Sequence, residues 1–292
     1  MIPVLQSLTY ERKYRDDILS LIFYSRHTHT HLDWYKVGNW LDLDGNLIQL
    51  AFDRDELVGV MGFSENLNGS SWLRIAAVAQ GYDPTQVMTF LWENTRLQLM
   101  QAQVQSASIL VLSQWLPPHL PALGFRYQED VVTMHRAQQS IPPAPPTAII
   151  LRNGYLEHVE AIMQVDHAAF APPWQLSATD IRLSQRQAAS CTIALLGGQI
   201  VGYEIATRHH TNGHLARLAV HPQVQGQRVG QALLHHLLTR FAQRGVKSMT
   251  VNTQLSNRRS QNLYVRYGFV RNGFDLSVWQ ADLTSSNDER LL

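Results

Sequence analysis

The stretch that decides the fold runs from Leu215 to Gln231: Leu-Ala-Arg-Leu-Ala-Val-His-Pro-Gln-Val-Gln-Gly-Gln-Arg-Val-Gly-Gln. It opens with an apolar, partly β-branched run that stops at His221-Pro222, as a strand stops at a turn. From Val229 the apolar residues recur at three- and four-residue spacing until Gly245, which predicts an amphipathic helix. Residues 225–230 are therefore predicted to lie at a helix N-terminus.

Such a position is suited to phosphate. The first N–H groups of a helix have no intrahelical partner and carry the positive end of the helix dipole, and glycine lets a ligand approach the backbone closely. The turn Gln225 to Gly230 has neither the Gly-x-x-x-x-Gly-Lys-Ser/Thr pattern of a P-loop nor a Gly-x-Gly-x-x-Gly fingerprint. Taken alone, the turn is equally compatible with a loop that binds nothing.

The next segment carries a second set of signals. Ser248 to Thr253 is predicted to be a strand, and Asn257, Tyr264 and the pair Gly268-Phe269 follow it in order. With the turn, these residues resemble the GNAT acetyltransferase superfamily, whose Gln/Arg-x-x-Gly-x-Gly/Ala turn binds the pyrophosphate of acetyl-CoA. The resemblance covers roughly residues 148–283. Arg228 departs from it, because the family usually has glycine there.

The resemblance implies an acetyl-CoA-dependent N-acetyltransferase that moves an acetyl group directly to a primary amine. It implies that the pantetheine arm pairs with backbone groups of a strand and that Asn257 helps to hold the cofactor. Tyr264 is expected to donate a hydrogen bond or proton to the departing thiolate. The expected cofactor-binding residues are Leu218, Ala219, Val220, Gln225, Gly226, Gln227, Arg228, Val229, Gly230, Gln231, Asn257 and Tyr264.

The base that removes the amine proton is harder to identify. Related N-terminal acetyltransferases of ribosomal proteins often carry glutamate where this chain has Asn252, an amide that cannot accept a proton near neutral pH. Glu204, on the predicted strand Gln199 to Thr207, is the expected catalytic base if it faces the cleft. The alternative is a strand carboxylate that faces solvent. His209, His210 and His214 are further titratable groups, expected at a hairpin.

Two other features are candidates for ligand contacts. Phe170-Ala171-Pro172-Pro173-Trp174 is similar to the Phe-x-x-Pro-Trp segment that borders the acceptor site in those N-terminal acetyltransferases, although core packing explains both aromatic residues as well. Arg217 and Arg228 are candidates for steering phosphate.

Composition excludes several classes of protein. The 292 residues are 45% hydrophobic and only 16% charged, with a formal net charge of +1 and no dense basic run. We therefore expect no nucleic-acid partner. Cys191 is the single cysteine and cannot form an intrachain disulfide, and no segment is long and apolar enough to span a membrane. We expect a cytoplasmic monomer or homodimer whose acceptor is a small amine or a protein N-terminus.

The chain is predicted to hold two tandem GNAT-like domains of the α/β (α+β) class, each a mixed, mostly antiparallel sheet flanked by helices. Four prolines in residues 137–147 predict a linker. The predicted segments are 1–136, 148–285 and a tail at 286–292. Val58-Gly59, Ala77-Val78 and Gly124-Phe125 recur as Val201-Gly202, Ala219-Val220 and Gly268-Phe269 at nearly constant offset, which indicates a repeat.

The first repeat is expected to be degenerate. Residues 83–88 stand where the glycine turn stands in the second repeat, with Pro84 at the place of Gly226. Leu120 replaces Tyr264 and Ser113 replaces Asn257. The two-domain layout with an active second half resembles that of mycothiol synthase. The departures leave a non-catalytic acyl-CoA sensor or scaffold as the alternative function.

The sequence also contains His27-Thr28-His29-Thr30-His31, which would place three histidines on one face of an extended segment. We expect a polar loop or a lining of the cleft rather than a metal site, because no second cluster of ligands accompanies them.

Overall fold

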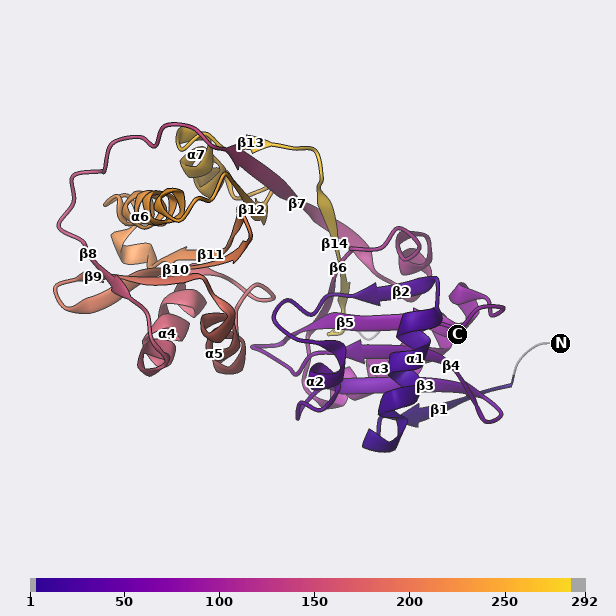
Figure 1. The fold of residues 1–292 in the computed structure, drawn as a ribbon. Helices are drawn as coiled ribbons and strands as arrows, with labels where there is room; N and C mark the ends of the chain where they lie inside the picture. Colours follow the sequence, from indigo (N-terminus) through magenta and orange to yellow (C-terminus); the bar gives the residue numbers. More distant parts are fainter. Residues whose placement is uncertain (1–3, 285–292) are drawn as a thin grey trace. The chain divides into compact units, whose positions relative to one another are not determined.

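The computed structural model describes residues 4–284, which form two compact units (Figure 1). Unit 1 contains the chain up to Glu129 and again from Leu276, and unit 2 contains Asp130–Asp275. The sequence-based division into 1–136 and 148–285 is continuous, whereas the division in the structure is not. The predicted tail at 286–292 lies outside the described residues.

Unit 1 is a twisted sheet with helices on its faces. Its strands follow the order β1-β3-β4-β5-β6-β14, with β2 paired to β5. The bounds are β1 (Leu5–Thr9), η1 (Arg12–Tyr14), α1 (Arg15–Tyr24), β2 (His27–Thr30), α2 (Val37–Leu41), β3 (Leu47–Asp53), β4 (Glu56–Phe63), β5 (Ser70–Val78), α3 (Pro84–Gln101), β6 (Ser106–Leu110), η2 (Pro117–Leu123) and β14 (Leu276–Asp282).

Unit 2 repeats this plan. Its strands follow the order β7-β12-β11-β10-β9-β8, with the short β13 paired to β7. The bounds are β7 (Arg126–Ala137), β8 (Ile150–Asn153), η3 (Leu156–His158), α4 (Val159–Ala169), α5 (Ala178–Gln187), β9 (Ser190–Leu196), β10 (Gln199–His209), β11 (Asn212–Val220), η4 (Pro222–Val224), α6 (Val229–Gln243), β12 (Ser248–Gln254), α7 (Arg258–Arg266) and β13 (Val270–Arg271).

Each sheet contains one parallel pair, β5 with β6 and β11 with β12, beside antiparallel neighbours. These mixed, mostly antiparallel sheets between helices confirm the predicted fold class. The predicted hairpin at Leu47 to Phe63 and the predicted helix from Val229 are confirmed as well.

The two halves of the sequence exchange a strand. β7, at the end of the first half, pairs with β12 of unit 2 from Ser248↔Ala137 to Gln254↔Val131. β14, at the end of the second half, pairs with β6 of unit 1. This exchange is why the structural units differ from the predicted continuous segments.

Apolar residues fill both faces of the sheet in unit 2. Leu234, Leu237 and Phe241 of α6 pack with Leu215 of β11 and Val251 of β12 in one core. On the opposite face, α4 packs against β10 and β11. Side chains alternate along a strand, so neighbouring residues of β11 point to these two different faces. In residues 4–284, no helix combines the length and the apolar character needed to cross a bilayer.

Candidate functional site

The central feature of unit 2 is a slot between β11 and β12. The two parallel strands pair from Asn212↔Ser248 to Leu215↔Val251, and in the described chain their ladder ends there. β11 continues to Val220 with only its other edge paired, to β10. β12 continues to Gln254 with its other edge paired to β7. Two backbone edges therefore face the slot with donors and acceptors available for a ligand.

The turn between β11 and α6 leads out of this slot. Gly226 and Arg228 both have left-handed backbones, with φ of +89° and +66°. Such a φ is strained for a residue with a side chain, which accounts for the family's glycine at the position of Arg228. The first bond inside α6 joins the Ala232 N–H to the Arg228 carbonyl at 2.9 Å. The N–H groups of residues 229–231 precede it and have no helical acceptor.

The first turn of α6 also lies close to its neighbours. A Cβ atom placed on Gly230 would lie 3.3 Å from Leu263 of α7 and 3.6 Å from Leu218 of β11. The expected cofactor residues from Leu218 to Gln231 are therefore contiguous in space, with the backbone edge of β11 at one end and the α6 amides at the other.

Arg259 is a cation that the sequence analysis missed. It lies in the first turn of α7, and its guanidinium donates to the side-chain oxygen of Gln225. Gln225 itself donates to the Val220 carbonyl at 3.0 Å. Arg228 reaches the carbonyl of Pro146 at 3.3 Å. The signal for Arg259 was its place two residues after Asn257, where a helix that packs beside α6 begins.

Asn257 and Tyr264 lie on α7, which borders the same region. Asn257 caps the helix, since its Oδ1 accepts from the Ser260 N–H at 3.1 Å. Tyr264 is buried in the core that contains Leu215 and Val251, the last paired residues of the slot, and its ring packs on Phe269 with centroids 5.7 Å apart.

Burial raises the pKa of Tyr264, and the positive charge of Arg217 and a hydrogen bond to Ser260 offset this only in part. The hydroxyl therefore keeps its proton across the physiological range and remains a hydrogen-bond donor. Arg217 extends to the α4 face, whereas Tyr264 packs on the α6 face.

Glu204 is not placed where its expected role requires. It pairs with Leu218 across β10 and β11, is fully buried, and its Oε1 accepts from Ser190 at 2.6 Å and Thr192 at 2.7 Å. Burial raises its pKa to about 7, against the effect of these hydrogen bonds. Among the described residues, its Oε2 has no partner. It lies on the face covered by α6, because its neighbour Tyr203 reaches Asp166 of α4 on the other face.

Arg217 is held by protein groups rather than left available for phosphate. It forms an ion pair with buried Asp166 at 2.7 Å and donates to the Trp174 carbonyl at 2.6 Å. Its guanidinium lies 3.7 Å from the centre of the Phe170 ring. Asp166 also accepts from Tyr203 at 2.5 Å. This network fixes the connection between α4 and α5 against β11, so the expected phosphate role of Arg217 is replaced by a structural one.

Unit 1 fills the equivalent slot with its own chain. β5 pairs with β6 only from Ser70↔Ser106 to Trp72↔Ser108, which again leaves an edge beyond the parallel ladder. Here β2 occupies that edge, from His27↔Val78 to Thr30↔Ile75. The carbonyl of Thr28 accepts from Ser113 at 2.8 Å and from the indole of Trp115 at 3.0 Å, which closes the far side of β2.

The helix that follows β5 is also closed to anions. Asp83 caps α3 and accepts from the Thr85 N–H at 3.0 Å, and Pro84 occupies the first helical position. A carboxylate at this point both satisfies an amide and repels a phosphate. The missing glycine turn of unit 1 thus has a direct structural counterpart at the start of α3.

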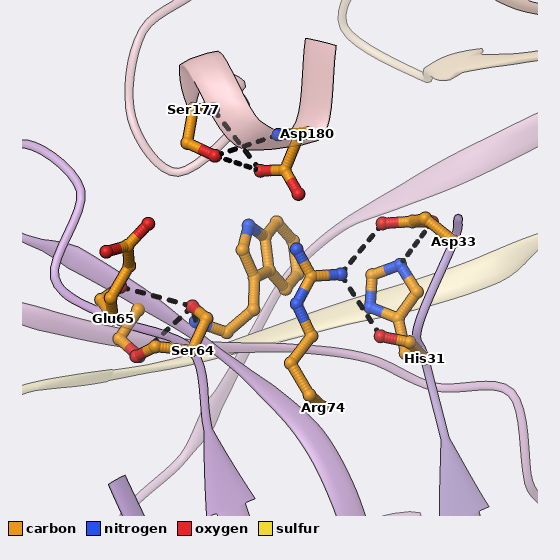
Figure 2. A network of polar contacts seen from close by, with 9 residues as sticks. His31, Asp33, Ser64, Glu65, Arg74, Ser177 and Asp180 are labelled. Carbon is orange, nitrogen blue, oxygen red and sulfur yellow. Dashed lines mark hydrogen bonds and ion pairs between the residues drawn. The ribbon is translucent and has the colours of Figure 1, made fainter. Parts of the chain in front are cut away.

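His27 and His29 lie in strand β2 and His31 directly follows it, so this segment is a strand rather than the expected polar loop. His29 is fully buried and burial lowers its pKa to about 3, so it is neutral at physiological pH. Figure 2 shows His31 beside Asp33, which also binds Arg74 at 2.8 Å. The same view shows the unit 2 capping pair in which the Ser177 hydroxyl donates to Asp180 at 2.8 Å. In the described part of the chain, no group of three metal-ligating side chains is suited to hold a metal ion.

A mixed sheet with a splayed parallel pair, followed by a turn and a helix whose first amides lack a helical acceptor, is the arrangement that the resemblance to GNAT acetyltransferases predicts. Residues 159–269 match the model of the acetyltransferase (GNAT) family. Unit 2 is therefore a GNAT-family domain, and the predicted family is confirmed.

Individual proteins agree with this assignment. The chain is 20% identical over 127 residues to a putative ribosomal protein bS18-alanine N-acetyltransferase of Bacillus subtilis (strain 168), covering 44% of this chain and 84% of that protein. The crystal structure of a GCN5-related N-acetyltransferase from Sphaerobacter thermophilus matches with a TM-score of 0.61, 16% identity and 96% coverage of both chains. A tandem GNAT protein from the clavulanic acid biosynthesis pathway matches with a TM-score of 0.61, 13% identity, 97% coverage of this chain and all of that one. The tandem arrangement of the fold is thus shared with solved proteins.

Proposed function

We propose that unit 2 transfers the acetyl group of acetyl-CoA directly to a primary amine. The observation that carries this proposal is the slot between β11 and β12, whose strand edges are unpaired in the described part of unit 2 and lead to a helix N-terminus without an acidic cap. In a thioester carrier such as acetyl-CoA, the amide-containing arm matches the unpaired strand edges, and the diphosphate matches the helix N-terminus.

In this proposal the backbone of Leu218 to Val220 pairs with the pantetheine amides as an added strand would. The diphosphate binds to the N–H groups at the start of α6, where the helix dipole favours negative charge. Arg228 and Arg259 supply positive charge beside the turn. Asn257 positions the start of α7 through its cap.

Amine acylation needs two proton-handling groups. A primary amine with a pKa near 10 is the free base in about one molecule per thousand at neutral pH, so a group must remove a proton. The departing thiolate needs stabilisation as well. A thiolate is a weaker base than a phenolate, and burial raises the pKa of Tyr264 further, so complete proton transfer from Tyr264 is unfavourable. Tyr264 acts instead as a hydrogen-bond donor to the sulfur.

The acceptor class is a primary amine, either a small molecule or a protein N-terminus. The relative from Bacillus subtilis is named as a putative ribosomal protein bS18-alanine N-acetyltransferase. The segment from Phe170 to Trp174, anchored on Arg217, forms the α4-face border on which an acceptor would bind.

The test is a thiol-release assay with acetyl-CoA and a panel of small amines and N-terminal peptides, run beside calorimetry with acetyl-CoA and CoA. The expected result is binding of the carrier and thiol release with at least one amine class. Binding without release on any acceptor would identify an acyl-CoA sensor. No binding at all would reject both functions.

A further inference from the structure

We propose that His214 is the catalytic base that removes the amine proton. This inference rests on the proposed function and names a group that it lacks. Glu204 lies under α6, and Asn252 is an amide. His214 lies one residue before Leu215, where the paired part of β11 ends and the slot begins.

The strand register places His214 on the acceptor side of the sheet. Leu215, Met249 and Val251 all belong to the core beneath α6. Their neighbours His214 and Thr250 therefore point to the opposite face, which α4 covers further along β11. A thioester carbonyl at the closed end of the slot would lie next to this pair.

The imidazole is oriented by one hydrogen bond. Nδ1 of His214 lies 2.9 Å from Oγ1 of Thr250, its partner across the strands. When Nδ1–H donates to Thr250, Nε2 carries the lone pair and can accept a proton. In the described residues, no hydrogen bond engages Nε2. His214 is partly buried, and burial lowers its pKa, so the ring is neutral at physiological pH.

The groups around His214 do not compete for this role. His135 of β7 lies in the same register row, beyond Thr250. Thr207 of β10 lies on its other side and is not titratable near neutral pH. Arg217 and Asp166 lie on this face but are paired with each other. A free imidazole next to the slot is therefore the available acceptor.

Nε2 of His214 takes one proton from the ammonium form of the acceptor, and the free amine nitrogen then attacks the thioester carbonyl carbon. The C–N bond forms, the C–S bond breaks, and the thiolate leaves with a hydrogen bond from Tyr264. The new amide nitrogen loses its second proton to the thiolate through solvent, and the imidazolium returns its proton to solvent. The products are the amide, the free thiol and one proton, and both side chains are restored.

The experiment compares His214→Gln with His135→Gln. Glutamine keeps a hydrogen-bonding group opposite Thr250 but cannot accept a proton. We expect His214→Gln to lower kcat by 10² to 10⁴ at pH 7, with acetyl-CoA affinity by calorimetry within twofold of the wild type. Its rate should rise with pH towards the pKa of the amine, whereas the wild-type rate should level off above the pKa of the histidine. His135→Gln should retain the wild-type pH profile.

A second variant, Thr250→Val, removes the orienting hydroxyl and should lower kcat about tenfold, less than loss of the base. If His214→Gln has the kcat and pH profile of the wild type, His214 is not the base. The proposed function still stands in that case, provided that the wild type releases thiol. A wild type that binds acetyl-CoA yet acetylates no amine overturns both. Loss of acetyl-CoA binding in His214→Gln would show a structural role and also overturn it.

Discussion

The two units share one framework and differ in what fills its central opening. In both, a parallel pair of strands stops pairing part-way, at Trp72↔Ser108 in unit 1 and at Leu215↔Val251 in unit 2. β2 pairs with this edge in unit 1, whereas no described strand pairs with the corresponding edge of β11 in unit 2. The same fold can therefore carry this strand edge either paired or unpaired.

The helix termini repeat the contrast. Asp83 caps α3 with a carboxylate, whereas the N-cap residue of α6, Arg228, makes no side-chain cap, and in the described residues the first amides of α6 have no helical acceptor. Two independent changes, a strand in the slot and an acid at the helix, therefore act in the same direction in unit 1. We infer that unit 1 supports unit 2 rather than binding a second cofactor.

The largest expected difference between the units is in binding. Calorimetry of the full chain with acetyl-CoA should give one site, because pantetheine would have to displace β2 from four pairs of residues in unit 1. Competition by CoA at the same stoichiometry is the control. Two sites of similar affinity would show that β2 leaves its edge easily and would remove the contrast.

A second difference concerns the position of Glu204, which Met61 occupies in unit 1 by the repeat offset. Burial raises the pKa of Glu204 from 4.5 to about 7. Between these values the native state holds a proton that the unfolded chain has lost, so the free energy of unfolding falls as pH rises through this window. The loss is about 3 kcal/mol and is complete above pH 7.

Glu204→Gln should abolish this dependence while keeping an acceptor for Ser190 and Thr192. Urea unfolding at pH 5 and pH 8 measures it, with the exposed Glu157→Gln as the matched control that leaves the dependence unchanged. The variant should also retain kcat, since the carboxylate lies under α6. A fall in kcat of a hundredfold would instead make Glu204 the base.

The third difference is that unit 2 has Tyr264 where unit 1 has Leu120. Tyr264→Phe removes the hydroxyl without changing the ring, so kcat should fall about 10², with little change in acetyl-CoA affinity. Tyr267→Phe is the control, because its buried hydroxyl donates to the Gln231 carbonyl at 3.1 Å outside the proposed chemistry. Equal turnover of wild type and Tyr264→Phe would remove the role of the hydroxyl.

Local patterns predicted the elements that carry the site. The apolar run before His221-Pro222 and the helical spacing from Val229 correspond to β11 and α6. Alternation along the strand also placed Glu204 and Tyr203 on opposite faces of the sheet. It does not predict what covers each face, and in the structure α6 covers one face and α4 the other. Glu204 is therefore buried under α6, whereas the sequence predicted a carboxylate that faces the cleft, with a solvent-facing one as the alternative.

The sequence pattern did not predict which strands pair with partners far along the chain. We interpreted residues 27–30 as a polar loop or a lining of the cleft, whereas their pairing with the edge of β5 makes them a strand. The exchange of β7 and β14 has the same origin, because both strands are ordinary in sequence and their partners lie far along the chain. Arg259 is a candidate site residue because α7 packs beside the turn, and this packing is not encoded in a local sequence pattern.

The smallest expected effect tests the helix terminus itself. Arg228 has φ of +66°, a conformation that asparagine and aspartate tolerate better than most residues with a side chain. Arg228→Asn and Arg228→Asp should therefore have similar stability, while only aspartate gives α6 the negative cap that Asp83 gives α3. Acetyl-CoA should bind the aspartate variant about tenfold more weakly than the asparagine variant at low salt, and the gap should narrow as salt screens the charge. Equal affinities would place the diphosphate away from the first turn of α6, and the open slot would then have to bind another part of the carrier.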